Sequence, residues 1–566
     1  MGRLDRSDTT ASQNTGVKQP TALCFAVTFK TIVCDDPIVK VEQGLVLGKV
    51  QEAVVGGYQY YSFENIPYAK PPVGPFRFKA PEAPTPWEGV RNCTALGPMC
   101  PQYSPLSDLL KLGNEDCLTV NVYTRNLTGK SSVLVYIDGF AYSFDRDYDD
   151  LYGADYMVKD LVVVTFNHRR DVFGFLNLGT KDVSGNAALK DQVALLKWVQ
   201  KNIAAFGGNP DSVTLAGLSS GSAAIAHHLM SPLSTGLFHR AIMLSGVPTC
   251  DAIYSYKVKE KSFLLGKQLG YDGEDPEELL TFLQNVPYED LIHKMVYVSS
   301  AEEQTSLLLK KMSTFVPVIE DDFGQERFIS EDITTALKNG LVNNVEILIG
   351  YSDQEALIVV NQYADYMLNL YKNNPLLFVP NKILYQEDIE DKKPEIANAI
   401  KKYYLGDKEV SVDNMKEFVQ CNSHSCMIYD VLKFAQKVSQ LTDTYLLKFS
   451  SVSSRNVYGN EGQKYSIKGA SHGDTVLYMF DPKPLNMVVD ANSKEYAMIR
   501  QFVGSLSTFA ASGKPAPESD WPKFTVDSQN YVEFTDTMTL KQGPNSADVQ
   551  FWDSIYEQAN HPIYPY

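Results

Sequence analysis

The sequence lacks any long uninterrupted apolar run. No stretch of its 566 residues reaches the roughly 18 consecutive apolar residues that a membrane-spanning helix needs. It also lacks a basic run, and its net charge is −17. A chain of this charge repels the phosphates of nucleic acid. We therefore expect a soluble or membrane-peripheral protein that has no membrane span and does not bind nucleic acid.

Metal-ligand spacings are also missing. The eight cysteines include no C-x2-C pair, and no histidine-rich tract accompanies them. Cys421 and Cys426 lie five residues apart, which favours two thiols on different faces of one helix. We therefore expect no structural zinc and no other metal site.

No Gly/Ser-rich or Pro-rich linker and no internal repeat divides residues 38–560, which predicts one large domain. The polar N-terminal sequence predicts that residues 1–37 are disordered. Within them, residues 22–34 resemble a degraded signal segment that Lys30 interrupts. Sequons at Asn92 and Asn126 predict glycosylation and favour secretion. A cytoplasmic location is the alternative, because the signal segment is poor.

Short apolar runs alternate with helical patterns along the chain. The runs that predict strands are residues 133–137, 161–166, 213–216, 241–244, 345–349 and 445–449. Runs of this length suit strands buried on both faces of a mostly parallel sheet. Helical spacing occurs at 189–204 and 222–230, and 250–345 is more helical and is expected to cover one end of the sheet. The alternation predicts an α/β fold with a large, mostly parallel central sheet flanked by helices.

Residues 217–221 read Gly-Leu-Ser-Ser-Gly, with an apolar run before them and a helical pattern after them. A strand-turn-helix places Ser219 at a tight turn with its hydroxyl exposed, and the two glycines remove Cβ atoms that would clash there. The helix N-terminus directs N–H groups at a developing oxyanion. The alternative is a serine-rich turn without chemistry.

A serine nucleophile needs a base, and the base needs an acid that orients it. Among eight histidines, His472 follows a predicted strand in a glycine-flanked loop, where such a base belongs. His227 and His228 lie on the helix after the turn and are expected to face away from it. Glu355 follows the predicted strand 345–349 and is the candidate acid, although a lone loop glutamate is usually only solvated.

Several long segments resemble the type-B carboxylesterase/cholinesterase family of α/β-hydrolases, and the insect carboxylesterases most closely among them. They are SFENIPYAKPPVGPFRFKAPEAPTPWEGV (62–90), NEDCLTVNVY (114–123) and GNAALKDQVALLKWVQKNIAAFGGNPDSVTLAG (185–217). The resemblance implies a carboxylic ester hydrolase that needs no metal or organic cofactor and takes a small-molecule ester. It implies a catalytic triad of Ser219, Glu355 and His472. It also implies a disulfide bond between Cys100 and Cys117, which fits an oxidising compartment.

The sequence departs from this family where the oxyanion hole should form. The family strand usually ends His/Tyr-Gly-Gly-Gly/Ala-Phe, whereas this chain reads Asp138-Gly139-Phe140-Ala141-Tyr142. The resemblance places the oxyanion donors on the backbone N–H groups of Phe140, Ala141 and Ser220. We expect Phe140 to disfavour a φ above zero and to crowd the substrate. We expect Asp138 to oppose the charge of the oxyanion, so that replacing Asp138 by His and Phe140 by Gly raises kcat roughly tenfold. The alternative is that the loop has refolded around Phe140 and supplies the donors in another way.

Further departures are Leu218 in place of the usual elbow Glu, and His168, Arg170 and Asp171 in a segment that is usually Asn-Tyr-Arg-Leu-Gly. They suggest reduced or altered ester hydrolysis. The rival interpretation is a catalytically weak or silent esterase-like binding or adhesion protein. No Trp lies between residues 100 and 117, where cholinesterases carry their cation-binding Trp, so a choline ester is not expected.

Overall fold

The fold is taken from a computed structural model of the chain. It describes residues 36–104, 109–111, 113–144, 151–253, 255–295, 298 and 313–561. The predicted N-terminal segment 1–37 lies almost wholly outside these residues, as do Cys24 and Cys34.

A large twisted sheet forms the centre of the described structure, with eleven strands in the order β16-β15-β14-β13-β12-β11-β9-β10-β8-β4-β3. Its middle strands all pair in parallel. They are β10 (Val162–Phe166), β9 (Ser131–Ile137), β11 (Gly208–Leu218), β12 (Arg240–Leu244), β13 (Glu346–Ser352), β14 (Thr444–Phe449) and β15 (Asn530–Phe534). The antiparallel strands at its two ends are β3 (Lys49–Glu52), β4 (Gln59–Pro67), β8 (Thr119–Thr124) and β16 (Met538–Gln542). This is the predicted mostly parallel α/β sheet.

Two smaller sheets lie on the N-terminal side of the chain. One contains β1 (Ile38–Val41), β2 (Gly44–Leu47) and β5 (Val90–Asn92), and the other contains β6 (Gln102–Ser104) and β7 (Leu109–Lys111).

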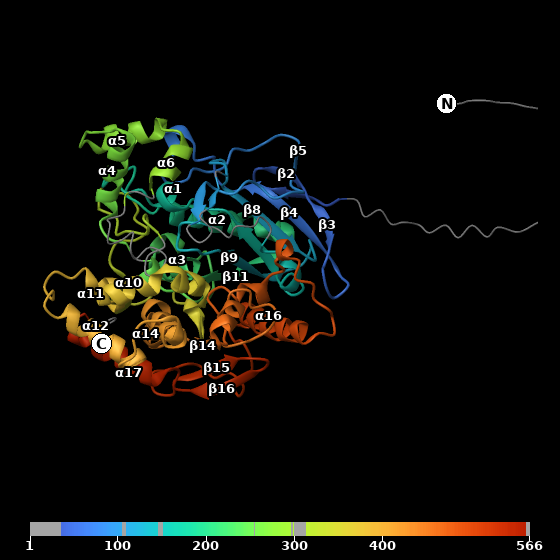
Figure 1. Ribbon diagram of the computed structural model, residues 1–566. Helices are drawn as coiled ribbons and strands as arrows, with labels where there is room; N and C mark the ends of the chain where they lie inside the picture. Colours follow the sequence, from blue (N-terminus) through green and yellow to red (C-terminus); the bar gives the residue numbers. More distant parts are fainter. Residues whose placement is uncertain are drawn as a thin grey trace, which may run out of the picture. The chain divides into compact units, whose positions relative to one another are not determined.

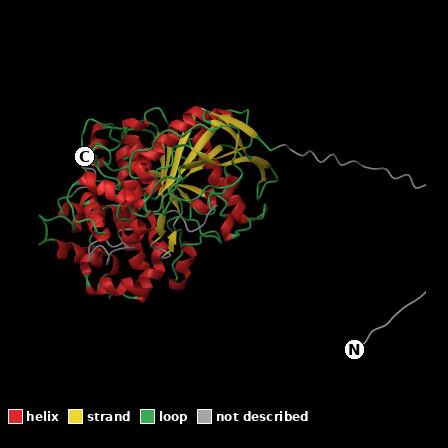
Figure 2. Ribbon diagram, turned by 90° about the horizontal axis from the view of Figure 1, so that it is seen from above, coloured by secondary structure: helices red, strands yellow, loops and turns green. Residues whose placement is uncertain are grey.

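Helices cover both faces of the large sheet (Figures 1 and 2). Alternate side chains of β9 show why its apolar run is continuous. Val133, Val135 and Ile137 join a core that includes residues of α2 (Ala187–Asn202) and α3 (Ser220–Met230). Leu134 and Tyr136 join a second core with α16 (Lys494–Ser512). A strand buried on both faces has no solvent side, so it carries no polar alternation.

The region between β12 and β13 is helical, as predicted for 250–345, within its described residues. It contains α4 (Val258–Leu269), α5 (Pro276–Asn285), α6 (Tyr288–Met295) and α8 (Ile333–Asn339). After β13 come the longer helices α12 (Lys393–Leu405), α13 (Met415–Ser423) and α14 (Tyr429–Val438), and α17 (Ser546–Gln558) follows β16.

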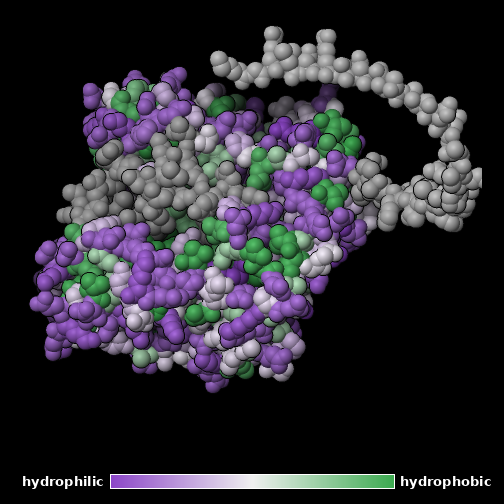
Figure 3. Space-filling model, turned by 45° about the vertical axis from the view of Figure 1, so that its right-hand side comes forward, coloured by the Kyte–Doolittle hydropathy of each residue, from purple (hydrophilic) through white to green (hydrophobic). Residues whose placement is uncertain are grey.

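The visible surface is mainly hydrophilic, with small separate hydrophobic patches (Figure 3). Among the described residues, no helix is both long enough and apolar enough to cross a membrane.

The carboxyl ends of parallel strands meet at one edge of a sheet, which is where ligands bind in open α/β folds. Here β9 leads directly into Asp138, β11 into Ser219 and β13 into the loop that carries Glu355. The sequence therefore brings the candidate residues to a common edge from separate parts of the chain.

Candidate active site

Ser219 lies at the sharp turn between β11 and α3, with φ 56° and ψ −123°. This left-handed conformation is uncommon for a residue with a side chain, and it is held by close backbone packing. A Cβ on Gly221 would lie 2.1 Å from the carbonyl oxygen of Ile137, and one on Gly246 would lie 2.2 Å from that of Ser219. The predicted strand-turn-helix is present, and the glycines are needed because neighbouring backbone occupies the space of a side chain.

Glu355 and His472 form a hydrogen-bonded pair. His472 Nδ1 lies 2.7 Å from Glu355 Oε2, and the other carboxylate oxygen accepts a 2.7 Å bond from the Ser352 amide. Both side chains are buried, at 3% and 7% exposure. A carboxylate at Nδ1 favours the tautomer whose proton is on Nδ1, which leaves Nε2 free to act as a base.

Among the described contacts, no hydrogen bond joins the Ser219 hydroxyl to His472. Catalytic hydrogen bonds are often long in a site without substrate and shorten when the substrate binds. The structure thus shows the candidate base His472 hydrogen-bonded to the candidate acid Glu355, with Ser219 on the same edge of the sheet.

Asp474 fixes the loop that carries His472, a role that the sequence reasoning missed. The carboxylate of Asp474 is fully buried and accepts hydrogen bonds from the amides of Ser471 (2.8 Å) and Gly459 (3.1 Å) and from the Asn456 side chain (3.1 Å). The nearness of Asp474 to His472 in the sequence was the one available signal.

His228 has a structural role on α3. Its Nε2 lies 2.9 Å from the Gln192 side-chain oxygen, and its Nδ1 lies 2.7 Å from the Ser234 hydroxyl. Burial, and to a smaller extent the neighbouring His227, lowers the pKa of His228 to about 3.

The segment 138–144, which we call the oxyanion turn, follows β9 and packs against the Ser219 turn. Ala141 and Tyr142 have left-handed φ values of 53° and 64°. Phe140, which was expected to disfavour a φ above zero, is not among the left-handed residues, and Ala141 and Tyr142 carry this conformation instead. The Phe140 ring packs on Phe144, with ring centroids 5.1 Å apart.

Gly139 lies where the oxyanion turn meets the Ser219 turn. A Cβ at this position would be 1.9 Å from the Leu218 carbonyl oxygen and 2.4 Å from the Gly221 nitrogen. The Tyr142 amide donates a 2.9 Å hydrogen bond to the Ser220 hydroxyl. The two turns are therefore in direct backbone contact.

The carboxylate of Asp138 is buried and forms an ion pair with Arg170. His168 Nδ1 lies 3.7 Å from the other carboxylate oxygen. Burial, and then the charge of Arg170, lowers the pKa of His168 well below its usual range, so this imidazole is neutral. The charge of Asp138, which was expected to oppose the oxyanion, is thus paired with that of Arg170. Replacing Asp138 by His would leave Arg170 without that partner.

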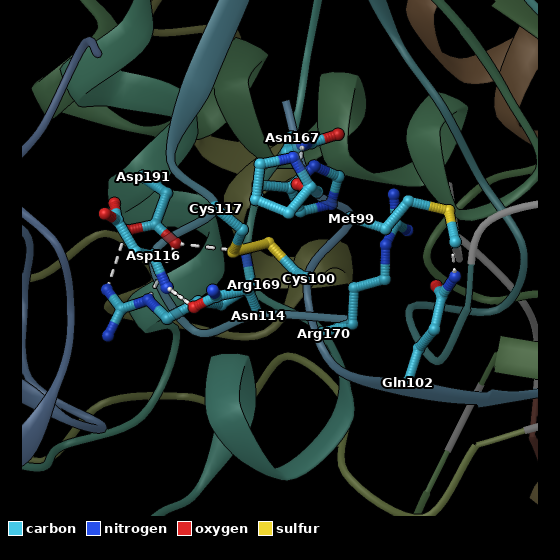
Figure 4. The surroundings of a disulfide bond; sticks show 12 residues. Met99, Cys100, Gln102, Asn114, Asp116, Cys117, Asn167, Arg169, Arg170 and Asp191 are labelled. Atoms are coloured by element: carbon cyan, nitrogen blue, oxygen red, sulfur yellow. Dashed lines mark hydrogen bonds and ion pairs between the residues drawn. A yellow bond between two sulfur atoms is a disulfide. The ribbon is translucent and has the colours of Figure 1, made fainter. Parts of the chain in front are cut away.

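Arg169 forms a separate ion pair on the same loop. Its guanidinium donates to both carboxylate oxygens of Asp191, at 2.8 Å and 2.6 Å. The disulfide bond between Cys100 and Cys117 is present, and Arg169 and Arg170 lie in its surroundings (Figure 4).

The predicted glycosylation residues Asn92 and Asn126 are exposed. In each sequon the threonine hydroxyl donates to the asparagine side-chain oxygen, at 2.8 Å for Thr94 and 2.9 Å for Thr128. In the described part of the chain, no group of three or more His, Cys, Asp or Glu residues could hold a metal ion.

A large, mostly parallel sheet with a strand-serine-helix turn at its carboxyl edge is the architecture of the α/β-hydrolases. The solved structure of juvenile hormone esterase from Manduca sexta, with OTFP covalently attached, has the same fold. It matches with a TM-score of 0.82 at 29% identity, covering 92% of this chain and 100% of that one. The Carboxylesterase family model matches residues 35–552, and the chain belongs to this family.

Two characterised relatives support the same assignment. Juvenile hormone esterase of Heliothis virescens is 29% identical over 576 residues, covering 92% of this chain and 97% of the relative. Esterase E4 of Myzus persicae is 32% identical over 528 residues, covering 89% and 92%. This chain is thus a carboxylic ester hydrolase of the serine type.

Proposed function

We propose that the protein hydrolyses a small-molecule carboxylic ester through Ser219, His472 and Glu355. The 2.7 Å contact between His472 and Glu355 carries the proposal, because it prepares a base at the sheet edge that also holds the strained Ser219. Ser219 attacks the ester carbonyl while His472 Nε2 takes its proton. His472 then protonates the leaving alcohol, and water hydrolyses the acyl-enzyme by the same route.

The N–H groups of Phe140, Ala141 and Ser220 are the proposed donors to the oxyanion. The left-handed backbone of Ala141 and the contact of the turn with Ser220 support this assignment. Because the charge of Asp138 is compensated, we propose that the altered strand redirects activity to a different ester rather than abolishing it.

The test compares the wild type with Ser219→Ala in fluorophosphonate labelling and in hydrolysis of p-nitrophenyl esters of increasing acyl length. We expect stoichiometric labelling of the wild type at Ser219, and a loss of at least about 10³-fold in kcat for the variant. Retention of more than about a tenth of the wild-type kcat by Ser219→Ala would contradict the mechanism. A folded wild type that neither labels nor hydrolyses any ester would favour the silent binding protein.

A further inference from the structure

The oxyanion turn holds a backbone conformation that its own residues disfavour. Ala141 and Tyr142 are both left-handed, and neither is a glycine. A residue with a side chain disfavours this conformation, because its Cβ lies too close to the following carbonyl oxygen. Strained residues of this kind persist where the surrounding structure fixes them. The contacts that fix this turn therefore control where its amides point.

Arg170 binds the turn at both of its ends. Its guanidinium forms the ion pair with Asp138 and donates a 3.2 Å hydrogen bond to the carbonyl oxygen of Phe144. The Arg170 side chain is 3% exposed, so water does not replace these contacts. A planar guanidinium presents donors in a fixed fork, and this geometry lets one side chain set the distance between two acceptors.

The residue after Arg170 holds the middle of the turn. The Asp171 amide donates a 2.8 Å hydrogen bond to the Tyr142 carbonyl oxygen, and the Asp171 carboxylate accepts one of 2.8 Å from the Ser143 hydroxyl. Asp171 has a left-handed φ of 41°. The segment after β10 thus contacts the turn at its ends and at its centre.

We infer that Arg170 is a positioning residue for ester hydrolysis, which holds the amides of Phe140 and Ala141 toward the oxyanion by fixing Asp138 and Phe144. The inference rests on the proposed function. Arg170 acts through the backbone of the turn and does not touch the substrate. Its effect therefore falls on the transition state, in which the oxyanion exists, and not on binding of the ground-state ester.

The main test variant removes both charges of the pair, as Asp138→Asn with Arg170→Met. A single Arg170→Met change would remove the ion pair from a buried carboxylate and destabilise the fold. Arg170→Lys keeps the charge but replaces the fork by a single ammonium, which is not expected to hold both ends of the turn. Arg327→Met is the matched control, because Arg327 is partly exposed and pairs with the exposed Asp322 rather than with a residue of the turn.

The measurements are kcat and KM on p-nitrophenyl acetate per fluorophosphonate-titrated site, and the Ki of an aryl trifluoromethyl ketone. The serine adduct of this ketone carries an oxyanion. We expect the double variant to lose at least about tenfold in kcat, with a matching rise in Ki and with KM within about threefold of the wild type. Arg170→Lys should show a smaller fall in kcat and a smaller rise in Ki. Arg327→Met should equal the wild type in both.

Unchanged kcat and Ki per titrated site in both Arg170 variants would overturn the inference. So would a fall in the number of titrated sites with kcat and Ki per site unchanged, because Arg170 would then support only folding. A wild type that does not hydrolyse the ester or react with the fluorophosphonate would instead refute the proposed function, and the inference with it.

Discussion

The two carboxylate oxygens of Glu355 connect the His472 side chain to the end of strand β13. One carboxylate oxygen faces His472 and the other accepts the Ser352 amide at the end of β13. The imidazole is thereby fixed to the sheet through one side chain. The orientation of the His472 ring consequently depends on the buried Glu355 carboxylate, both of whose oxygens already have a partner.

Glu355→Gln should lower kcat on p-nitrophenyl acetate by roughly 10³–10⁴-fold, because an amide does not stabilise the imidazolium and can select the wrong tautomer. Steady-state kinetics per folded molecule measure the loss, and circular dichroism checks the fold. The matched change Glu326→Gln, at an exposed position, should leave kcat unaltered. A kcat within about tenfold of the wild type would show that another group orients His472.

The roles of single residues were predictable where a short stretch of sequence indicates them. Ser219 was predicted as the nucleophile because its glycines and flanking elements form a motif, and His472 and Glu355 were predicted as its partners from their places after strands. The pairing of Asp138 with Arg170 could not be read in this way, because the two residues follow different strands and meet only when those strands lie side by side. The left-handed φ values of Ala141 and Tyr142 were not predicted, because the path of the turn depends on those same contacts.

At the scale of elements, apolar runs located the central strands but not their full lengths. Strand β11 begins at Gly208, five residues before the predicted start, and its register with β9 shifts between Gly208 and Val213. The residues between Gly208 and Val213 are mostly polar, so a search for apolar runs does not detect this part of the strand. The antiparallel strands β3, β4, β8 and β16 and the parallel strand β15 were not predicted, because their runs are shorter or more polar.

Helix α3 also begins earlier than predicted, at Ser220 instead of residue 222. Serine and glycine favour helices weakly, so propensity alone placed the start too late. The contact of Gly221 with Ile137 and the contact of Ser220 with Tyr142 fix this first turn, and neither is visible in the local sequence.

The neutral His228 makes the attachment of α3 sensitive to acid. Its pKa is about 3 in the folded protein and near 6.5 when unfolded, so the unfolded state binds more protons below pH 6.5. The stabilisation is complete above pH 6.5 and is lost as the pH falls toward 3. At pH 5 the loss is about 2 kcal/mol.

Chemical unfolding at pH 7.5 and pH 5 measures this effect. His228→Gln should be less stable at pH 7.5, because it changes two buried hydrogen bonds, but it should lose about 2 kcal/mol less than the wild type between the two pH values. The exposed His293→Gln serves as the control and should keep the wild-type difference. An identical pH dependence in His228→Gln would rule out this account.

At the scale of the whole molecule, the Cys100–Cys117 disulfide closes a loop across 17 positions of the sequence. The chain-entropy model gives about 3 kcal/mol for a loop of this size. Replacing both cysteines by serine should therefore lower the free energy of unfolding by roughly 2–4 kcal/mol. Unfolding of the variant and of the oxidised wild type in urea measures the difference, and equal midpoints would contradict the prediction.

We propose that the protein is secreted, since the disulfide bond and the two exposed sequons fit an oxidising route. When the chain is expressed through a secretory pathway, we expect glycans on Asn92 and Asn126. Mass spectrometry before and after treatment with a glycosidase measures them. Thr94→Ala should remove the first glycan and Thr128→Ala the second, whereas serine at either position should keep its glycan. An unchanged mass after glycosidase treatment would oppose the proposal.

The buried pair of Asp138 and Arg170 has an evolutionary consequence. Losing either partner alone removes the ion pair of a buried charge at a cost of about 3–5 kcal/mol, a large part of the 5–15 kcal/mol that typically separates folded from unfolded protein. The two positions are therefore expected to change together rather than one at a time. An engineer who restores histidine at position 138 must replace the guanidinium in the same step.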